Sequence, residues 1–368
     1  MAVRTYATND ALTNKLYAIK LAVESIPHTF MRHFKGKSAN SLNQERYETS
    51  KNAGDRITIG LRVKLQGGGV VGGATLEGNE ESFDTQDDSI IINRLRHAVR
   101  VKAKGTMSQQ RVPFDLRNEA LDNLAQWWAD REDAWFANQL AGNNAITDLR
   151  YTGLQSALAP DAAHIIRPDS AATDQAVAAL SATTGEFTLK AIDVCVEKAQ
   201  TLEPLIRPIE YGGQRWYVCF VHPYQVTNLR TQFADGGWFD IQGKLVQGGE
   251  RTGNPLFTGA LGSWNQTILH AWERLPLGVN SSTGAAVAGT RRAVFAGAQA
   301  TWSAYGKGHN AGRLSWVEKT FDYDDELGVA AGCNGGLKKA RFNGADFATI
   351  AITTKAAAAS TFVTPDVP

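Results

Sequence analysis

The sequence has few cysteines and no excess of charge of either sign. Its three cysteines, Cys195, Cys219 and Cys333, are widely spaced, and it contains no C-x-x-C pattern for zinc binding or redox chemistry. This usage predicts buried free thiols in a reducing compartment. Lys and Arg total 38 against 37 Asp and Glu. The balance excludes a global attraction to nucleic acid or to an anionic membrane, so any charge effect must be local.

Long apolar segments are also absent. No run approaches the roughly 18 apolar residues that a membrane span needs. Lys15, Lys20 and Glu24 interrupt the apolar positions of the first segment. We therefore expect neither a signal peptide nor a membrane partner.

Catalytic and metal-binding motifs are missing as well. The seven histidines show no H-E-x-x-H or similar ligand spacing, and the chain has neither a phosphate-loop motif nor a G-x-S-x-G nucleophile elbow. The acids between Asp322 and Glu326 lack the glycine and closing glutamate of a calcium loop, which favours a solvated turn. The sequence predicts no catalytic residue, no cofactor and no metal, and therefore no enzyme.

What the chain does contain favours an α+β fold. Its 368 residues are 43% hydrophobic, which is enough for a sizeable core. The spacing predicts helices over Asp10 to Ile26, Asp115 to about Gly142, Phe187 to Leu202 and Pro223 to about Gln232. Strands are predicted in RWYVCFVHP, RRAVFAGAQATWSAYG and DFATIAITT, and the alanine-rich stretch from Tyr151 to Thr184 receives no assignment.

The N-terminal segment has the pattern of an arm. Its predicted helix carries one apolar stripe, which needs a partner. Basic residues and the polar stretch GKSANSLNQERYETSKNAG follow, with too little apolar surface to fold alone. A helix docked on its own domain is the alternative interpretation. The stripe consists of Leu12, Leu16, Ile19, Val23 and Ile26.

Two segments show the period-two alternation of half-buried strands. Apolar residues alternate with polar ones from Ile57 to Leu65, and again from Leu95 to Ala103. We predict that these strands pair as a long hairpin whose connection, Gln66 to Asp88, exceeds the usual length of a loop without structure. The basic residues assigned to one face of this hairpin are Arg62, Lys64, Arg94, Arg96, Arg100, Lys102 and Lys104.

The connection begins with glycines at the spacing of a dinucleotide-binding motif. Gly67, Gly69 and Gly72 match G-x-G-x-x-G, but that motif works only where the glycines open a helix. The residues that follow have no apolar stripe, and their acids would repel phosphate. We therefore interpret the glycines as a flexible tip. The acids are Glu77, Glu80, Glu81, Asp84, Asp87 and Asp88.

Such a hairpin would have an acidic tip and a basic shaft. Because basic residues that face one another across paired strands repel, the shaft is expected to bind an anion. The anion is either nucleic acid or the acidic tip of an identical neighbour, in a heterologous contact that can propagate. A solvated face on a monomer is the alternative. All thirteen charged residues named for the shaft and tip are candidate intersubunit contacts.

Glycines also recur every four residues at Gly328, Gly332 and Gly336. On a helix they would form a smooth strip that allows close backbone packing. A loop is the alternative.

Several separated blocks, in one order, resemble a known family. They are GDRITIGLRVKL, ATLEGNEESF, LRHAVRVKAKGTMSQQRVPFDLRNEA, VHPYQVTNLR, GNPLFTGALGSWN, RRAVFAGAQA and FDYDDELGVAAGCNGGLKKARFNGADFATI. The sequence resembles the major capsid proteins of short-tailed bacteriophages of the N-four-like group over about Asp55 to Thr353. This resemblance implies the HK-97-type capsid fold. It carries no catalytic residues, and the lysine–asparagine cross-link of some relatives has no matching motif here.

The resemblance implies a division of the chain and a set of partners. The expected parts are an N-terminal arm (1–54), an extended loop (55–112), a peripheral domain (113–190 and 290–356) with a spine helix (115–141), an axial domain (191–289) and a C-terminal tail (357–368). The expected function is self-assembly into hexamers and pentamers of an icosahedral virion shell around double-stranded DNA, bound without sequence specificity. Portal and scaffolding or decoration proteins are further expected partners, with assembly in the host cytoplasm. A nucleic-acid-binding module that uses the basic face of the 57–104 hairpin is the alternative function.

Overall fold

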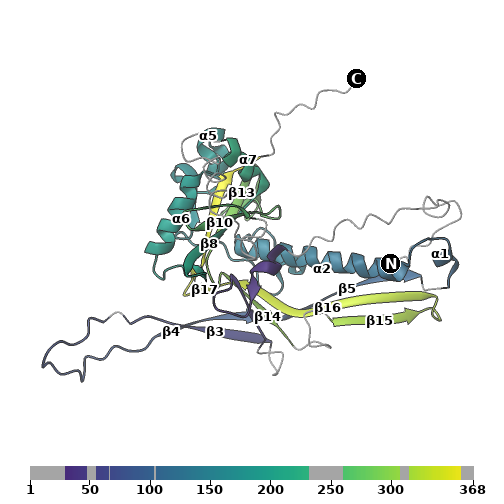
Figure 1. The fold of residues 1–368 in the computed structure, drawn as a ribbon, viewed down its shortest axis with the longest axis horizontal. Helices are drawn as coiled ribbons and strands as arrows, with labels where there is room; N and C mark the ends of the chain where they lie inside the picture. The colour runs from purple at the N-terminus through teal and green to yellow at the C-terminus, as the bar shows by residue number, and fades with distance from the viewer. Residues whose placement is uncertain are drawn as a thin grey trace.

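The computed structural model describes residues 30–47, 55–65, 67–102, 105–231, 260–306 and 315–357. The chain forms an elongated layer that ends in a projecting loop, and a compact part stands on this layer (Figure 1). The mixture of long helices and sheets confirms the predicted α+β class. The predicted helix from Asp10 to Ile26 lies outside the described residues, as does Lys104.

The elongated layer is one long helix packed on a six-stranded sheet of order β1-β2-β14-β16-β15, with β5 also paired to β16. Asp115 caps this helix, because its side chain accepts a hydrogen bond from the backbone N–H of Arg117. Leu124 and Trp128 of the helix pack on Val329 and Ala331 of the sheet. The elements are α2 (Leu116–Leu140), β1 (Lys35–Gly36), β2 (Asn43–Arg46), β5 (Asn93–Lys102), β14 (Thr301–Tyr305), β15 (Ser315–Phe321) and β16 (Glu326–Lys339).

The compact part is built on a sheet of order β6-β19-β13-β8-β10-β9, with β7 beside β8. The predicted buried strand RWYVCFVHP is confirmed as β8, whose Val218 and Phe220 are fully buried. The predicted helices at Phe187 and Pro223 are confirmed as α6 and α7. The strands are β6 (Ile165–Ile166), β7 (Ile209–Tyr211), β8 (Gln214–Val221), β9 (Ala260–Trp264), β10 (Thr267–Ala271), β13 (Thr290–Ala296) and β19 (Thr349–Lys355); the helices are α4 (Asp174–Ala179), α5 (Ala182–Gly185), α6 (Leu189–Thr201) and α7 (Pro223–Thr231).

The remaining elements are short, and within the described ranges no helix is both long and apolar enough to span a bilayer. The projection is a two-stranded ribbon of β3 (Arg56–Arg62) and β4 (Thr85–Ile91). The others are η1 (Phe30–Phe34), α1 (Met107–Gln110), α3 (Leu149–Thr152), η3 (Pro168–Ser170), and the pairs β11 (Gly278–Val279) with β12 (Ala286–Val287) and β17 (Arg341–Phe342) with β18 (Ala345–Asp346).

The predicted pairing of the 57–65 strand with the 95–103 strand is wrong. β3 pairs with β4, whose residues the sequence assigned to the acidic loop, and β5 pairs with β16 over ten residues. β4 tolerates its acids because Asp88 is buried against the ammonium of Lys338 and the backbone N–H of Arg341. The alternation within each predicted strand is confirmed, since Ile57 and Ile59 are buried and the even positions of β5 from Arg94 to Arg100 are exposed.

Two further predictions are corrected. The glycines Gly328, Gly332 and Gly336 lie in strand β16, neither in a helix nor in a loop. The polar stretch after the arm contains β2, which enters the six-stranded sheet beside β14. A polar residue can be buried here because the Asn43 amide is hydrogen-bonded on both sides. Its NH2 group donates to the Ser303 hydroxyl, and its carbonyl oxygen accepts from the Ser303 and Thr301 hydroxyls.

The two sheets draw strands from several of the predicted parts of the chain. The predicted strand from Arg291 to Gly306 splits into β13 of the compact part and β14 of the elongated layer. The DFATIAITT strand, expected with the spine helix, is β19 and pairs with β13 and β6 in the compact part. The compact part thus combines strands from the predicted axial range, 191–289, with strands from both ranges of the predicted peripheral domain, 113–190 and 290–356.

Candidate functional site

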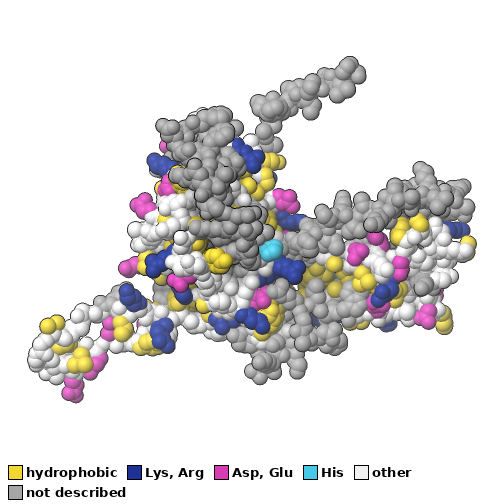
Figure 2. All heavy atoms as spheres, in the orientation of Figure 1, with side chains coloured by type: hydrophobic (Ala, Val, Ile, Leu, Met, Phe, Trp, Pro, Cys, Tyr) yellow, Lys and Arg dark blue, Asp and Glu magenta, His cyan; other side chains and the backbone are white. Residues whose placement is uncertain are grey.

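The projecting loop, residues 63–84, is the first of two surfaces with complementary charge, and we call it the acidic loop. Acidic and hydrophobic side chains gather along it, with Lys and Arg at its base (Figure 2). Its large apolar side chains are exposed, and exposed apolar side chains that lie together mark an interaction site. The exposed acids are Glu77, Glu80, Glu81 and Asp84, and the exposed apolar residues are Leu65 (60%), Val71 (88%), Leu76 (61%) and Phe83 (63%).

Turn contacts within the acidic loop hold two of its carboxylates. The Gly67 N–H donates to Glu81 Oε2 over 2.7 Å, and the Gly78 N–H donates to Glu80 Oε2 over the same distance. The residues after Gly72 form turns and irregular chain through residue 84 and open no helix. The dinucleotide-site geometry is therefore missing here, because an acid already occupies one of the glycine amides that would have to face phosphate.

The second surface is the face of the six-stranded sheet turned away from α2. Leu95 and Val99 of β5 and Leu327 of β16 pack toward the helix, so the alternate positions of these strands point to the opposite side. The register aligns Arg100, Gly328 and Lys319 in one row across β5, β16 and β15, and Ala98, Ala330 and Val317 in the next. We call this surface the basic sheet face. Its residues are Arg94, Arg96, Ala98, Arg100, Val317, Lys319, Gly328, Ala330 and Gly332.

One end of the basic sheet face is neutralised within the chain. Arg100 pairs with Glu326 at 2.5 Å, and Lys102 pairs with Asp325 at 2.6 Å and with Glu326 at 3.1 Å. The hydrogen bonds that the Lys102 ammonium donates to these two acids raise the pKa of Lys102. Two of the acids between Asp322 and Glu326, Asp325 and Glu326, thus serve as partners for basic residues, whereas Asp322 and Asp324 are exposed. Within the described ranges, no group of three or more His, Cys, Asp or Glu side chains could hold a metal ion.

The Phe321 ring contacts two cations at this neutralised end of the basic sheet face. The guanidinium of Arg100 lies 4.2 Å from the ring centroid of Phe321, and the Lys319 ammonium lies 5.3 Å from it. A Cβ added at Gly328 would approach this ring to 2.7 Å, so glycine is what lets the ring lie across β16.

The other end of the face is open. Arg94 and Arg96 are exposed, and neither guanidinium has an ion pair among the described residues. Their neighbours across the sheet are Asn334 and Gly332.

The structure separates the thirteen predicted contact residues into groups. The four acids of the loop and the cations Arg62 and Lys64 lie on the projection and are exposed, and Asp87 is exposed on β4. Asp88 is buried and pairs with Lys338 of the same chain, and its role as an intersubunit contact stays a prediction. The predicted repulsion between the two basic strands is also wrong, because they do not pair. Sequence reasoning missed Val317 and Lys319; a period-two interpretation of the stretch after Glu326 would have indicated their strand partner.

Comparison with known proteins relates nearly the whole chain to phage capsid proteins. The family described as phage capsid protein matches residues 5–358. The chain is 28% identical over 376 residues to the major capsid protein of Pseudomonas phage KPP25, covering 92% of both chains. Its structure is similar to the capsid of Ralstonia phage GP4, at 31% identity and a TM-score of 0.79 over 97% of this chain and 99% of that chain. The fold also matches the Cyanophage Pam1 capsid asymmetric unit, at 20% identity and a TM-score of 0.71 over 97% of this chain and 100% of that chain.

Proposed function

Because the chain belongs to the phage capsid protein family, we propose that its shell is held together by the acidic loop of one subunit lying on the basic sheet face of the next. The chain is a major capsid protein with the HK97-type fold, a structural subunit of an icosahedral phage shell. Membership of the N-four-like group stays a prediction.

The position of the two surfaces supports a contact between copies. The acidic loop projects from one end of the long axis, whereas β15 and β16 extend to the other end (Figure 1). The loop therefore points away from the basic sheet face of its own chain. A contact between unlike surfaces of identical subunits is heterologous, and such contacts close into rings and shells when the rotation allows it.

Apolar burial supplies more of the contact energy than the ion pairs do. An exposed ion pair contributes about 0–1 kcal/mol, whereas burying one large apolar side chain fully contributes roughly 1.5–3 kcal/mol. The loop has four such side chains to bury, and the sheet face offers Val317 and the Phe321 ring. In this proposal the charges Glu80, Glu81, Arg94 and Arg96 select the register, and apolar contacts hold it.

The remaining assignments are proposals that follow from the family. The compact part would be the axial domain, the α2 layer the peripheral domain, and residues 1–54 an arm. Subunits would assemble in the host cytoplasm as hexamers and pentamers, with portal and scaffolding or decoration proteins, around double-stranded DNA bound without sequence preference. We propose no catalytic role.

Charge reversal with rescue tests the loop contact. The loop variant Glu80→Lys/Glu81→Lys should remain folded by circular dichroism and fail to form shells in negative-stain micrographs. The face variant Arg94→Glu/Arg96→Glu should fail in the same way. Combining the four substitutions restores opposite charges and the wild-type net charge, so shells should reappear.

A matched control carries the same charge change elsewhere. Asp122→Lys/Glu197→Lys alters two exposed acids of α2 and α6 and should assemble normally. Normal shells from the loop variant would remove the loop from the mechanism, and failure of the combined variant to assemble would remove the basic sheet face as its partner.

The alternative function, nucleic-acid binding by the basic face, is favoured by Arg94 and Arg96, which have no ion pair in the part of the chain that the structure describes. It predicts that unassembled subunits bind DNA with an affinity that falls steeply with salt and is lost in the face variant. Salt-dependent binding of that kind, together with normal shells from both reversal variants, would replace the loop contact as the role of this face.

A further inference from the structure

A cavity lies on the opposite side of the sheet, between α2 and strands β14 and β16. Its volume is about 190 Å³. Residues at helical spacing on one face of α2 form one wall of the cavity. Strands β14 and β16 form the other wall, mostly with small or apolar residues. The lining residues used below are Ala125, Trp128, Ala129, Glu132, Phe136 and Cys333.

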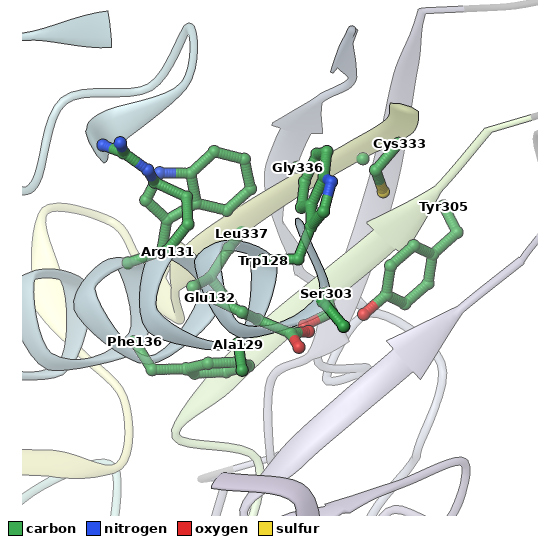
Figure 3. Close-up of a pocket in the computed structure, with 13 residues that line it drawn as sticks. Trp128, Ala129, Arg131, Glu132, Phe136, Ser303, Tyr305, Cys333, Gly336 and Leu337 are labelled. Atoms are coloured by element: carbon green, nitrogen blue, oxygen red, sulfur yellow. The ribbon is translucent and has the colours of Figure 1, made fainter. Parts of the chain in front are cut away.

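The chemistry of the cavity suits one or two aliphatic side chains. An apolar cavity of about 150 Å³ already admits a benzene-sized group. Glu132 extends toward Ser303 and the Tyr305 hydroxyl on one side, and Trp128 lies beside Cys333 and Gly336 on another (Figure 3). Trp128 is 8% exposed, and its indole N–H has no hydrogen-bond partner among the described residues. A backbone carbonyl of an occupant would satisfy this donor.

The described chain starts beside this cavity. The backbone N–H of Phe30 donates to Asp133 Oδ2 over 2.9 Å, and that of Met31 donates to Oδ1 over 3.4 Å. Lys35 then pairs with Glu132, a lining residue. The 29 residues before Phe30 therefore leave the described part within one helical turn of the cavity.

The length and pattern of the preceding residues match the cavity. Ile26 is four residues before Phe30, and Pro27 breaks a helix at that point. The stripe from Leu16 to Ile26 would span about 15 Å as a helix, and the lining from Ala125 to Phe136 spans about 16 Å of α2. The four Cα–Cα steps from Ile26 to Phe30 span at most about 14 Å, so the end of the stripe reaches the cavity first.

We propose that the cavity is the docking site for the N-terminal segment of the same chain, with Val23 and Ile26 as the side chains that fill it. Lys20 and Glu24 lie off the apolar stripe and would face away from the cavity. This docking fixes the start of the arm on α2 and leaves the basic sheet face free for a neighbouring subunit. It does not depend on the loop contact.

The reaction rate of the Cys333 thiol measures access to the cavity, because this side chain lines the cavity and is only partly buried. In the full unassembled chain, Val23→Ser/Ile26→Ser should speed the reaction of Cys333 with a disulfide reagent at least tenfold. The control Lys20→Ser/Glu24→Ser should leave the rate unchanged. The buried Cys195 and Cys219 should stay unreactive in both, which shows that the fold is kept. A rate for the stripe variant within twofold of wild type would overturn the proposal.

A single added thiol gives a second, independent measurement. Under mild oxidation Ile26→Cys should form a disulfide with the native Cys333, whereas Glu24→Cys should not. Mixing isotopically light and heavy chains distinguishes a bond within one chain from one between copies by peptide mass. Only same-chain bonds support the proposal; bonds between copies, or equal bonding by both variants, would refute it.

Discussion

Replacing Asp174 by asparagine should destabilise the subunit far more than a change at the surface. The Asp174 carboxylate is buried and accepts four hydrogen bonds: from Arg167 Nε at 2.7 Å, Arg292 Nη2 at 2.7 Å, Arg292 Nε at 3.1 Å and the Val279 N–H at 2.9 Å. Arg292 also donates to the carbonyls of Ala141 and Gly142, where α2 ends. The cluster thus ties the compact part to the long helix.

The magnitude follows from the charge that the substitution leaves behind. Asparagine keeps the shape of the side chain but removes the negative charge, so the guanidinium of Arg292 stays buried without a counter-ion. Removing one partner of a buried pair costs about 3–5 kcal/mol. The exposed Asp122→Asn should change the free energy of unfolding by no more than about 0.5 kcal/mol.

The pH dependence of the free energy of unfolding tests the same cluster independently. Burial alone would raise the pKa of Asp174, but Arg292, Arg167 and the Val279 amide outweigh it and hold that pKa below its ordinary value. The stabilisation is therefore complete above the ordinary carboxyl pKa and is lost as the pH falls through the lower, folded value. Urea unfolding of unassembled subunits at pH 7 and in the acid range measures both effects. A loss below about 1 kcal/mol for Asp174→Asn at pH 7 would refute the role given to this cluster.

Two other perturbations give sharp expectations. Gly336→Ala should lower the free energy of unfolding in urea by about 1–3 kcal/mol, because the added Cβ would come within 2.3 Å of the Ile91 carbonyl oxygen. The control Gly60→Ala places its Cβ where no atom lies within 4 Å and should be near neutral. Equal losses for the two variants would contradict this. Burial, with help from a nearby arginine, lowers the pKa of His222 to about 4, and its Nδ1 accepts from the Tyr224 N–H. Stability should therefore fall as the pH drops from about 6.5 toward 4, and His222→Asn should flatten that slope; an unchanged slope would contradict the assignment.

The alternation within each strand could be predicted from sequence, but its partner could not. Side-chain alternation is a property of one strand, so the faces of β5 were predicted correctly from Arg94 to Arg100. The choice between β4 and β5 as partner of β3 depends on distant residues. From its neighbours in the sequence, Asp88 is expected in an acidic loop. It is buried in a strand instead, because Lys338, 250 residues away, provides its counter-ion. Local composition carries no sign of that contact.

The glycines of β16 show how one pattern fits two periods. A spacing of four is close to a helical turn and is also a multiple of two, so Gly328 and Gly332 share a face of a strand as well. The sequence also showed which residues of the candidate site are charged, because charge, like side-chain alternation, can be seen within one segment. The corrected geometry of the site required the register of β16 with β5, which joins segments more than 200 residues apart, as well as the register of β16 with its neighbour β15.

The position of the acidic loop in an assembled shell tests the central claim most directly. A reconstruction by electron cryomicroscopy should place Glu80 and Glu81 of one subunit within ion-pair distance of Arg94 and Arg96 of a neighbour, with Phe83 or Leu76 against the same sheet face. A loop that contacts only its own subunit, or that lies on another surface of the neighbour, would contradict the account.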